Sequence, residues 1–234
     1  MRFFSLGKGD SNKYWEKKFN IDPRELEFEL KFYDLFSGDE KVLMEKMRTV
    51  LTKMGRGDLS GPIYLIVREL LTNSLKALYK RIYFDFFLAE VGYSDLPYEE
   101  WLEIFKTEIE THMAENFANI CREKEMYVEF TMKPLKNDLI FEIVNEGVPS
   151  DVEWKRLNSS FDKAKSQNDM SYLFLDDTEE DELQEGAGIG VPLISIMLKN
   201  MKLQFQNFQI LVENGRTVAR LIFPMTIFEK SQQT

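Results

Sequence analysis

Apolar and charged side chains alternate along the first regular stretch of the chain. From Leu26 to Tyr33 an apolar residue stands at every second position, which predicts a strand with one buried face. The final part of the chain contains Asn214-Gly215 between two apolar runs, a dipeptide typical of a tight β-hairpin. Further strands are predicted over Met126 to Lys133, Leu139 to Asn145, Leu203 to Phe208, Gln209 to Glu213 and Thr217 to Phe223.

Apolar residues recur at helical spacing in other stretches. Two long helices are predicted, over Val42 to Met54 and from Ser60 to Leu78. Gly55 ends the first helical pattern, and Ser60 followed by Pro62 is typical of a helix start. Residues 84–125 carry enough spaced apolar side chains for one or two further helices, and Val191 to Met201 predicts one more.

The order of these elements predicts an α+β fold, a two-layer α/β sandwich in which helices cover one face of a mixed sheet. We expect a single domain over residues 26–228 with a helical insert at about 84–125. A lead-in segment at 1–25 precedes this domain and a tail at 229–234 follows it. Residues 150–185 are polar and show little periodicity, and such a stretch in a compact domain is usually a functional lid or is disordered.

The composition of the 234 residues is that of a folded acidic protein, with 44% hydrophobic and 30% charged residues. The formal net charge of -10 argues against a nucleic-acid partner, because affinity for the phosphate backbone comes mainly from clustered basic residues. No apolar run reaches the length of about 18 residues that a membrane helix needs. The apolar stretch at the start is too short for a signal peptide. We therefore expect a cytoplasmic protein without a membrane partner.

Cysteine and histidine are too scarce for several kinds of chemistry. The single Cys121 excludes an internal disulfide, and the single His112 leaves too few soft ligands for a zinc site. A metal bound to this chain is therefore expected to be a hard ion held by oxygen atoms.

Three short motifs carry candidate chemistry. The first lies in the second predicted helix, where Glu69, Asn73 and Lys76 stand at positions i, i+4 and i+7 and form one polar line. Taken alone, this line is also typical of the exposed stripe of an amphipathic helix. The second motif begins with Asn145 and Gly147, where a predicted strand ends in a turn, and alone it resembles any strand exit.

The third motif places glycines at alternate positions directly before an apolar helix. Gly186, Gly188 and Gly190 let the backbone approach a ligand closely, and a helix start points free N–H groups at an anion. A phosphate site is the functional interpretation, and a flexible hinge before a helix is the alternative. The spacing fits neither the dinucleotide fingerprint nor a P-loop.

The three motifs, in this order, resemble the nucleotide-binding boxes of the GHKL superfamily, which includes gyrase-type ATPases, heat-shock chaperones, histidine kinases and MutL-type repair ATPases. The resemblance extends over roughly Leu26 to Pro224 and implies a Bergerat-type ATP-binding fold. The matching segments are Glu69-x-x-x-Asn73-x-x-Lys76 for the N box, Asn145-x-Gly147-x-Pro149 for the first glycine box and Gly186-x-Gly188-x-Gly190 for the second.

This resemblance implies ATP and Mg²⁺ as ligands. Asn73 would give its side-chain oxygen to Mg²⁺, Glu69 would polarise the attacking water or hydroxyl, and Lys76 would lie near the phosphates. Asn145, followed by Gly147, stands at the position that reads adenine. The three glycines of the second box would wrap the triphosphate with backbone N–H groups. Residues 150–185 would form the lid over ATP, with Phe161 as one of its aromatic residues.

The sequence also departs from the family pattern. Family members usually have aspartate where this chain has Asn145, and Pro149 replaces the second glycine of that box. The stretch from Asp176 to Glu185 is strongly acidic and contains no base. Such a run is usually a solvated segment, and its functional alternative is docking of a protein partner.

The layout around the boxes favours one branch of the superfamily. A histidine autokinase needs a phosphoacceptor histidine upstream of the N box, and none stands there because His112 follows it. The layout instead resembles anti-sigma factor serine kinases, which bind ATP and phosphorylate a serine of a partner protein. We expect an ATP-binding signalling protein with a regulatory protein partner, and a homodimer stays open.

Two other interpretations of the chain remain. The main alternative is a non-enzymatic GHKL module that regulates a partner through its helical insert and acidic lid. A gyrase-type or MutL-type ATPase fits less well, because no downstream transducer domain is expected.

Overall fold

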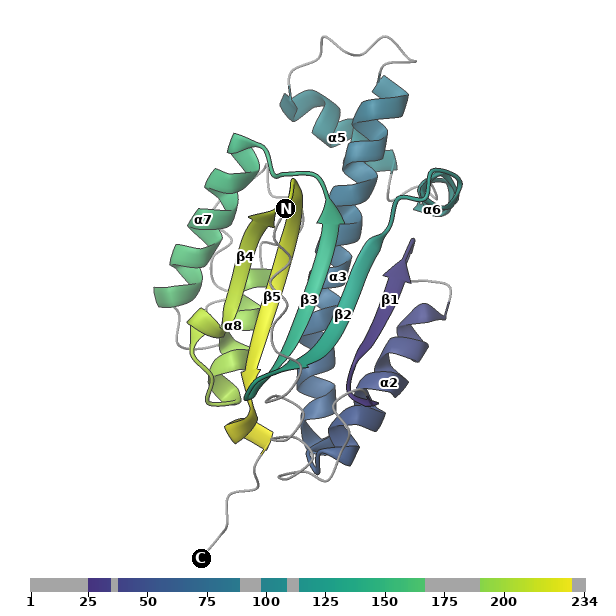
Figure 1. Cartoon of the computed structure of the whole chain (residues 1–234). Coiled ribbons are helices and arrows are strands. Elements are labelled where there is room, and N and C mark those ends of the chain that lie inside the picture. The colour runs from purple at the N-terminus through teal and green to yellow at the C-terminus, as the bar shows by residue number, and fades with distance from the viewer. Residues whose placement is uncertain (1–24, 35–37, 89–97, 109–113, 167–189, 229–234) are drawn as a thin grey trace, which may run out of the picture.

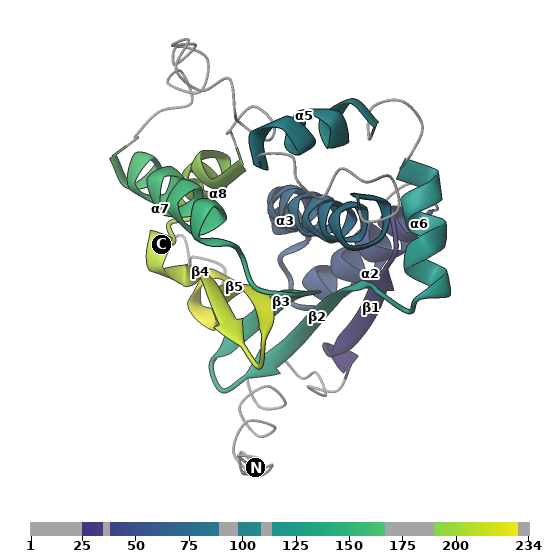
Figure 2. The ribbon, with the colours of Figure 1, turned by 90° about the horizontal axis from the view of Figure 1, so that it is seen from above.

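One layer of helices packs on one sheet in this protein. The computed structural model describes residues 25–34, 38–88, 98–108, 114–166 and 190–228. Within these residues a five-stranded sheet carries the helices on one of its two faces (Figure 1 and Figure 2). The predicted two-layer α/β sandwich is therefore confirmed.

The elements follow one another in an order close to the predicted one. The strands are β1 (Phe28–Phe32), β2 (Val128–Leu135), β3 (Asp138–Glu146), β4 (Phe208–Glu213) and β5 (Arg216–Pro224). The α-helices are α2 (Asp39–Lys53), α3 (Ser60–Ile82), α5 (Tyr98–Glu108), α6 (Ala114–Glu123), α7 (Asp151–Ser166) and α8 (Gly190–Asn200). The shorter segments are η2 (Gly57–Leu59), a π-helical turn η3 (Tyr83–Leu88), η6 (Phe205–Asn207) and η7 (Met225–Phe228).

The sheet has the strand order β1-β2-β3-β5-β4, and all four pairings between these strands are antiparallel. The prediction of a mixed sheet was therefore wrong for the described strands. Parallel neighbours need a crossover connection, but the long helical connection after β3 leads to β4 at the sheet edge, and β5 then returns beside β3. The predicted hairpin is confirmed, with Asn214 and Gly215 both at positive φ as a type I′ turn requires.

The core lies between the sheet and α3, which passes behind the central strands (Figure 1). Leu139, Phe141 and Ile143 of β3 all belong to this core and share one side of the strand. The Phe141 ring centroid lies 5.0 Å from that of Phe223 and 6.1 Å from that of Phe130. The sheet face that carries these rings is therefore the one that positions α3.

The segment predicted as a strand over Leu203 to Phe208 is instead a short 3-10 turn. The Gln204 backbone N–H donates to the Asn207 side-chain oxygen at 3.1 Å, and the Asn207 amide donates to the Ile222 carbonyl at 2.9 Å. These polar side chains satisfy the backbone locally, which competes with strand pairing. Strand β4 therefore begins only at Phe208.

Part of the predicted lid is a regular helix. Residues 150–185 were expected to lack periodic structure, but α7 covers Asp151–Ser166. The Ser150 N–H and hydroxyl both donate to the Glu153 carboxylate, at 2.7 and 2.9 Å, and the Glu153 N–H donates back to the Ser150 hydroxyl at 3.3 Å. This capping box starts the helix. Residues 167–185, with the acidic run, lie outside the described residues.

Among the helices that the structure describes, none combines the length and the apolar character required to cross a bilayer.

Candidate functional site

The polar line predicted on the second helix lies along α3. Glu69 is partly buried, whereas Asn73 and Lys76 are exposed. The Asn73 side-chain amide donates to Glu69 Oε1 at 3.1 Å, which fixes the two side chains relative to each other. Because the nitrogen of the Asn73 amide is used in this bond, its oxygen is left as an acceptor.

The start of α8 packs directly against this pair. A Cβ atom at Gly190 would lie 2.6 Å from Glu69 Oε1 and 3.1 Å from the Asn73 amide nitrogen. Only a residue without a side chain leaves Glu69 and Asn73 where they are. The structure thus brings together the first motif and the last residue of the third, while Gly186 and Gly188 lie outside the described residues.

Asn145 occupies the end of β3 on the sheet face that carries the helices. It pairs with Thr217 of β5 and lies on the same side of β3 as Phe141 and Ile143. The residue is only 8% exposed, and none of the described residues makes a hydrogen bond with its side-chain amide. Because buried amides are normally paired, this orphaned group is the strongest sign of a ligand-facing position.

Gly147 directly follows β3 and lies next to Arg81 at the C-terminal end of α3. Its φ of 94° is in the left-handed region, and a Cβ atom here would collide with the Arg81 guanidinium. The Thr217 hydroxyl donates to the Gly147 carbonyl at 2.8 Å and holds the turn to β5. Glycine at this second predicted motif therefore has a structural reason that applies without any ligand.

Lys80 and Glu153 join the site as an ion pair that sequence reasoning missed. Lys80 of α3 is 8% exposed and pairs with Glu153 at the start of α7. Burial acts to raise the pKa of Glu153, but the charge of Lys80 and the hydrogen bonds from Lys80 and Ser150 outweigh it and hold the pKa below its ordinary value. The signal was present in the sequence, because Lys80 extends the polar line of Asn73 and Lys76 by one more turn.

An apolar groove is lined by residues other than those of the three motifs. This open groove of about 420 Å³ is lined by Phe161, Phe205, Phe208 and Gln206. The Phe161 ring stacks on Phe208 at 5.4 Å and meets Phe205 edge-on at 5.2 Å. Phe161, matched by resemblance to a lid aromatic, therefore packs α7 onto the sheet. With one polar side chain and no charge, this groove does not suit a phosphate.

Comparison with known proteins finds a relative of this chain, but the name of that relative states no activity. No protein-family model matches the chain, and no solved structure matches it. The chain is similar to an uncharacterized protein of Treponema pallidum (strain Nichols), with 28% identity over 190 residues. The match covers 80% of this chain and 36% of that protein, so the chain spans about a third of the length of this relative.

Proposed function

We propose that this chain binds Mg·ATP as a histidine kinase-like ATPase domain of the GHKL type. The observation that carries the proposal is the contact of Glu69 and Asn73 with the helix start at Gly190. These groups come from two motifs far apart in the sequence, and together they offer what a magnesium phosphate group needs. A helix start supplies free N–H groups for phosphate oxygens, and the Asn73 oxygen is a ligand suited to a hard cation.

The buried amide of Asn145, which has no hydrogen-bond partner among the described residues, supports a second part of the same site. Gly147 contacts Arg81, which stands eight residues after Asn73 on α3. Eight residues of helix correspond to a rise of roughly 12 Å. The proposed phosphate end and the end of β3 are therefore separated along α3, as suits an extended ligand with a charged end and a base end.

Magnesium in this proposal depends on the nucleotide. No group of three or more acidic, histidine or cysteine side chains able to hold a metal lies within the part of the chain that the structure describes. Mg²⁺ usually keeps few protein ligands and takes the rest from phosphate and water. Asn73 would therefore hold the ion together with bound nucleotide, and the metal alone would bind weakly.

The proposed role in signalling is phosphoryl transfer to a protein serine, with Glu69 acting on the attacking hydroxyl. The Asn73 amide orients the Glu69 carboxylate, and the helix start of α8 lies beside it. A carboxylate held in this way can accept a proton from a nucleophile. The alternative is a module that binds nucleotide and regulates a partner without catalysis. It has the same binding site and lacks only the phosphoryl transfer.

Isothermal titration of the full chain tests nucleotide binding. We expect Mg·ATP to bind in the micromolar to millimolar range, and Asn73→Ala to weaken binding about tenfold, or 1.4 kcal/mol. Asn200→Ala is the matched control, because Asn200 is also an exposed helical asparagine but ends α8. A folded protein that gives no heat with ATP up to about 1 mM would exclude the proposed function.

The same titration separates binding from catalysis. Glu69→Gln keeps the size and the hydrogen-bond acceptor of the side chain, so ATP affinity should change little. Any ATP hydrolysis or serine phosphorylation should fall about 100-fold or more, as expected for a residue that acts on the nucleophile. Unchanged turnover in Glu69→Gln would contradict the role of this carboxylate and leave nucleotide binding intact.

A further inference from the structure

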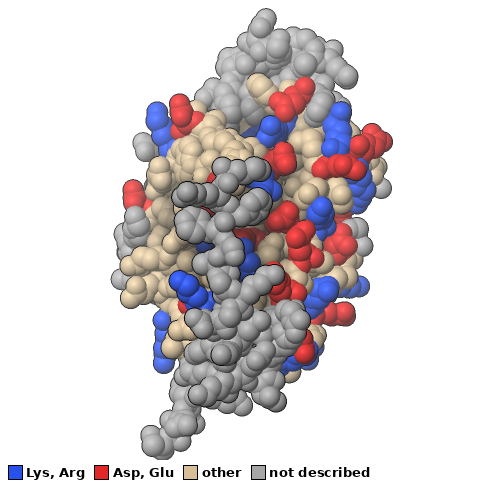
Figure 3. Space-filling view, in the orientation of Figure 1, with Lys and Arg blue, Asp and Glu red and all other residues tan. Residues whose placement is uncertain are grey.

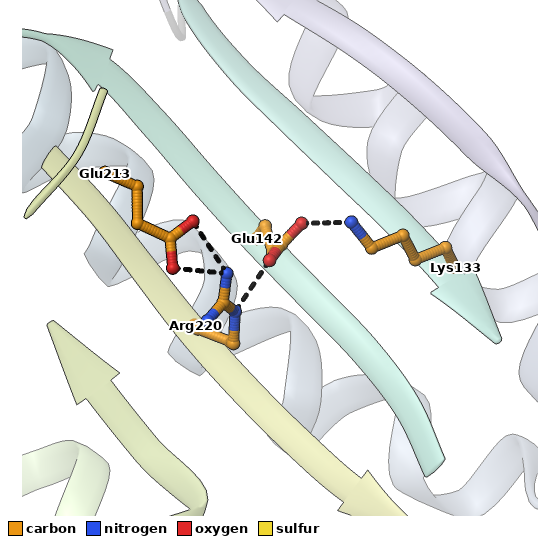
Figure 4. A network of polar contacts seen from close by, with 4 residues as sticks. All are labelled: Lys133, Glu142, Glu213 and Arg220. Carbon is orange, nitrogen blue, oxygen red and sulfur yellow. Dashed lines mark hydrogen bonds and ion pairs between the residues drawn. The ribbon is translucent and has the colours of Figure 1, made fainter. Parts of the chain in front are cut away.

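Four charged side chains on the sheet face opposite the helices form a network with one another (Figure 4). Arg220 Nε donates to Glu142 Oε1 at 2.6 Å, and Arg220 Nη2 donates to both oxygens of Glu213 at 3.0 and 3.1 Å. Lys133 pairs with Glu142 from the neighbouring strand. On the described surface of this face, acidic and basic side chains are interspersed (Figure 3). Arg220 is therefore an arginine whose donors are engaged within the sheet.

Arg81, at the C-terminal end of α3 in the helix layer, is held much less firmly. Its guanidinium lies against Gly147, where a Cβ atom would collide with Nη1. Its ion pair with Asp85 joins Nε to Oδ2 at 3.5 Å, and the two side chains are 44% and 45% exposed. An exposed pair of this kind contributes little stability, because water competes for both charges. A guanidinium carries five N–H donors, so Arg81 keeps donors that this pair does not use.

Asn145 lies at the same end of β3 as Arg81. Asn145 and Gly147 are two positions apart, which in a strand corresponds to roughly 6.6 Å, and the Arg81 guanidinium lies against Gly147. The Asn145 side chain faces the helix layer to which α3 belongs. It is 8% exposed, and its amide has no hydrogen-bond partner among the described residues. A buried amide without such a partner and a guanidinium with unused donors are therefore close enough to contact one ligand group.

The two side chains differ in the hydrogen bonds that they can make. The Asn145 amide both accepts and donates, so it can turn to suit either purine, whereas the Arg81 guanidinium only donates. Guanine presents two acceptors on one edge, O6 and N7, and adenine has an amino donor in place of O6. A guanidinium can therefore bind both guanine acceptors at once, but it meets the adenine amino group donor to donor. Arg81 thus decides between the two bases where Asn145 does not.

We propose that Arg81 recognises the base at this site and that the chain binds Mg·GTP at least as tightly as Mg·ATP. The inference rests on the proposed function, because it concerns the base end of the same nucleotide site. Arg81 would donate to O6 and N7 of guanine, and the Asn145 amide would bind the same base from the end of β3. The phosphate end lies eight residues earlier on α3, at Asn73, and meets the same triphosphate in both nucleotides. The base alone therefore separates GTP from ATP.

Isothermal titration of the full chain with the magnesium complexes of GTP, inosine triphosphate (ITP) and ATP tests the inference. The base of ITP keeps O6 and N7 but lacks the 2-amino group of guanine, so it isolates the contact assigned to Arg81. We expect GTP and ITP to bind within about threefold of each other, and ATP to bind no more tightly than GTP. No heat from any of the three nucleotides at about 1 mM would exclude the proposed function itself. Binding of ATP about tenfold or more tighter than that of GTP would overturn the inference and leave the proposed function standing.

A pair of matched arginine variants adds a second arm. Arg81→Met keeps an apolar stem and removes every donor, so it should weaken GTP and ITP binding about tenfold and change ATP binding less than about twofold. Arg68→Met is the control, because Arg68 is also an exposed arginine of α3 but pairs with Glu40 of α2 at 2.8 Å, and it should leave the ratio of GTP to ATP affinity unchanged.

Circular dichroism identifies a variant that fails to fold, in which case the three titrations of the unsubstituted chain decide. Equal losses of GTP and ATP affinity in folded Arg81→Met would overturn the inference, because they would mean that Arg81 acts on the nucleotide through its charge and not on the base.

Discussion

At the residue scale, Asn145 is the side chain whose chemistry most directly sets what the proposed site recognises. A carboxylate only accepts hydrogen bonds, whereas an amide accepts and donates. An aspartate at this position would suit an adenine amino group, and its charge-assisted bond would be stronger than a neutral one. The neutral amide should therefore bind ATP more weakly and separate ATP from GTP less well.

Asn145→Asp should tighten ATP binding five- to tenfold, or about 1 kcal/mol, and raise the preference for ATP over GTP. The change keeps the size of the side chain at a position that is 8% exposed. Titration of both nucleotides against both proteins provides the measurement. If the folded variant binds ATP no better, Asn145 does not face the base, and the assignment of the first glycine box is wrong.

Gly147 gives a second prediction, which concerns stability. Gly147→Ala should lower the free energy of unfolding by about 1–3 kcal/mol, because its φ of 94° is strained for any residue with a Cβ atom. Gly61→Ala is the matched control, since Gly61 lies in α3 with open space around it and should gain about 0.5–1 kcal/mol. Urea denaturation measures both. Equal effects at the two glycines would show that backbone strain does not distinguish them.

Part of the site could be predicted from residue spacing alone. Glu69, Asn73 and Lys76 share one line because four residues make about one helical turn. The same helical spacing places Lys80 one turn after Lys76. Its partner Glu153 lies in another helix, and residue spacing along the chain does not predict contacts between helices. Contacts between distant segments, such as Gly190 against Glu69, follow from packing and were predicted only through the resemblance.

At the element scale, the sequence contained a helix-start motif for α7 that the sequence analysis did not use. Ser150 and Glu153 form the S-x-x-E capping box, a recognised sign of a helix start. The helix has few apolar residues, and its partly buried side packs against α8 and, through Phe161, against the sheet. Weak periodicity therefore concealed a real helix. Conversely, apolar residues at Leu203 and Phe205 suggested a strand where polar capping produced a turn.

Helix α6, within the predicted insert, carries a chemical reporter of its own packing. Cys121 has no exposed surface, and burial raises the pKa of its thiol from 9.0 to about 12. The thiolate fraction at pH 8 is then about 1,000-fold lower than for an exposed thiol of ordinary pKa. We expect the native chain to resist a disulfide-exchange reagent, and the chain in urea to react rapidly.

The absence of other cysteines makes this measurement specific to α6. Addition of Mg·ATP at saturation is a useful control, since the thiol packs among core residues and should stay unreactive with nucleotide present. Rapid reaction of the native chain would mean that α6, with its residue Phe117, separates from Tyr79 of α3 on the timescale of the reaction.

At the scale of the whole molecule, the sequence predicted two layers but not the direction of every strand. Hairpins at Asn214-Gly215 and before Asp138 force antiparallel neighbours. The position of β4 at the sheet edge depends on the long connection from β3, whose course no local pattern specifies. The low exposure of Ile140, Val144 and Val218, on the side of the strands opposite the helices, was likewise not predicted, since alternation indicates two faces of a strand without giving the exposure of either.

Buried ion pairs make the whole fold sensitive to acid. The pKa of Glu40 is lowered by a hydrogen bond from Tyr64, and the pKa values of Glu142 and Glu153 are lowered by their basic partners against the effect of burial. A carboxylate with a depressed pKa in the folded state stabilises the fold above its unfolded pKa, near 4.5. That stability is lost as the pH falls through the folded pKa. Asp138, whose pKa burial raises, works in the opposite direction.

We therefore expect the free energy of unfolding to be roughly constant from pH 7 to pH 5 and to fall below about pH 4.5. Glu153→Gln replaces the carboxylate that pairs with the largely buried Lys80 by a neutral amide, so it should cost about 1–3 kcal/mol at pH 7. As the pH falls through the lowered pKa of folded Glu153, the difference between this variant and the unsubstituted chain should shrink, because the carboxylate then becomes protonated in the folded chain as well. Urea denaturation across this pH range measures both curves. Parallel curves with a constant gap would contradict the prediction, because they would mean that the charge of Glu153 contributes nothing to stability.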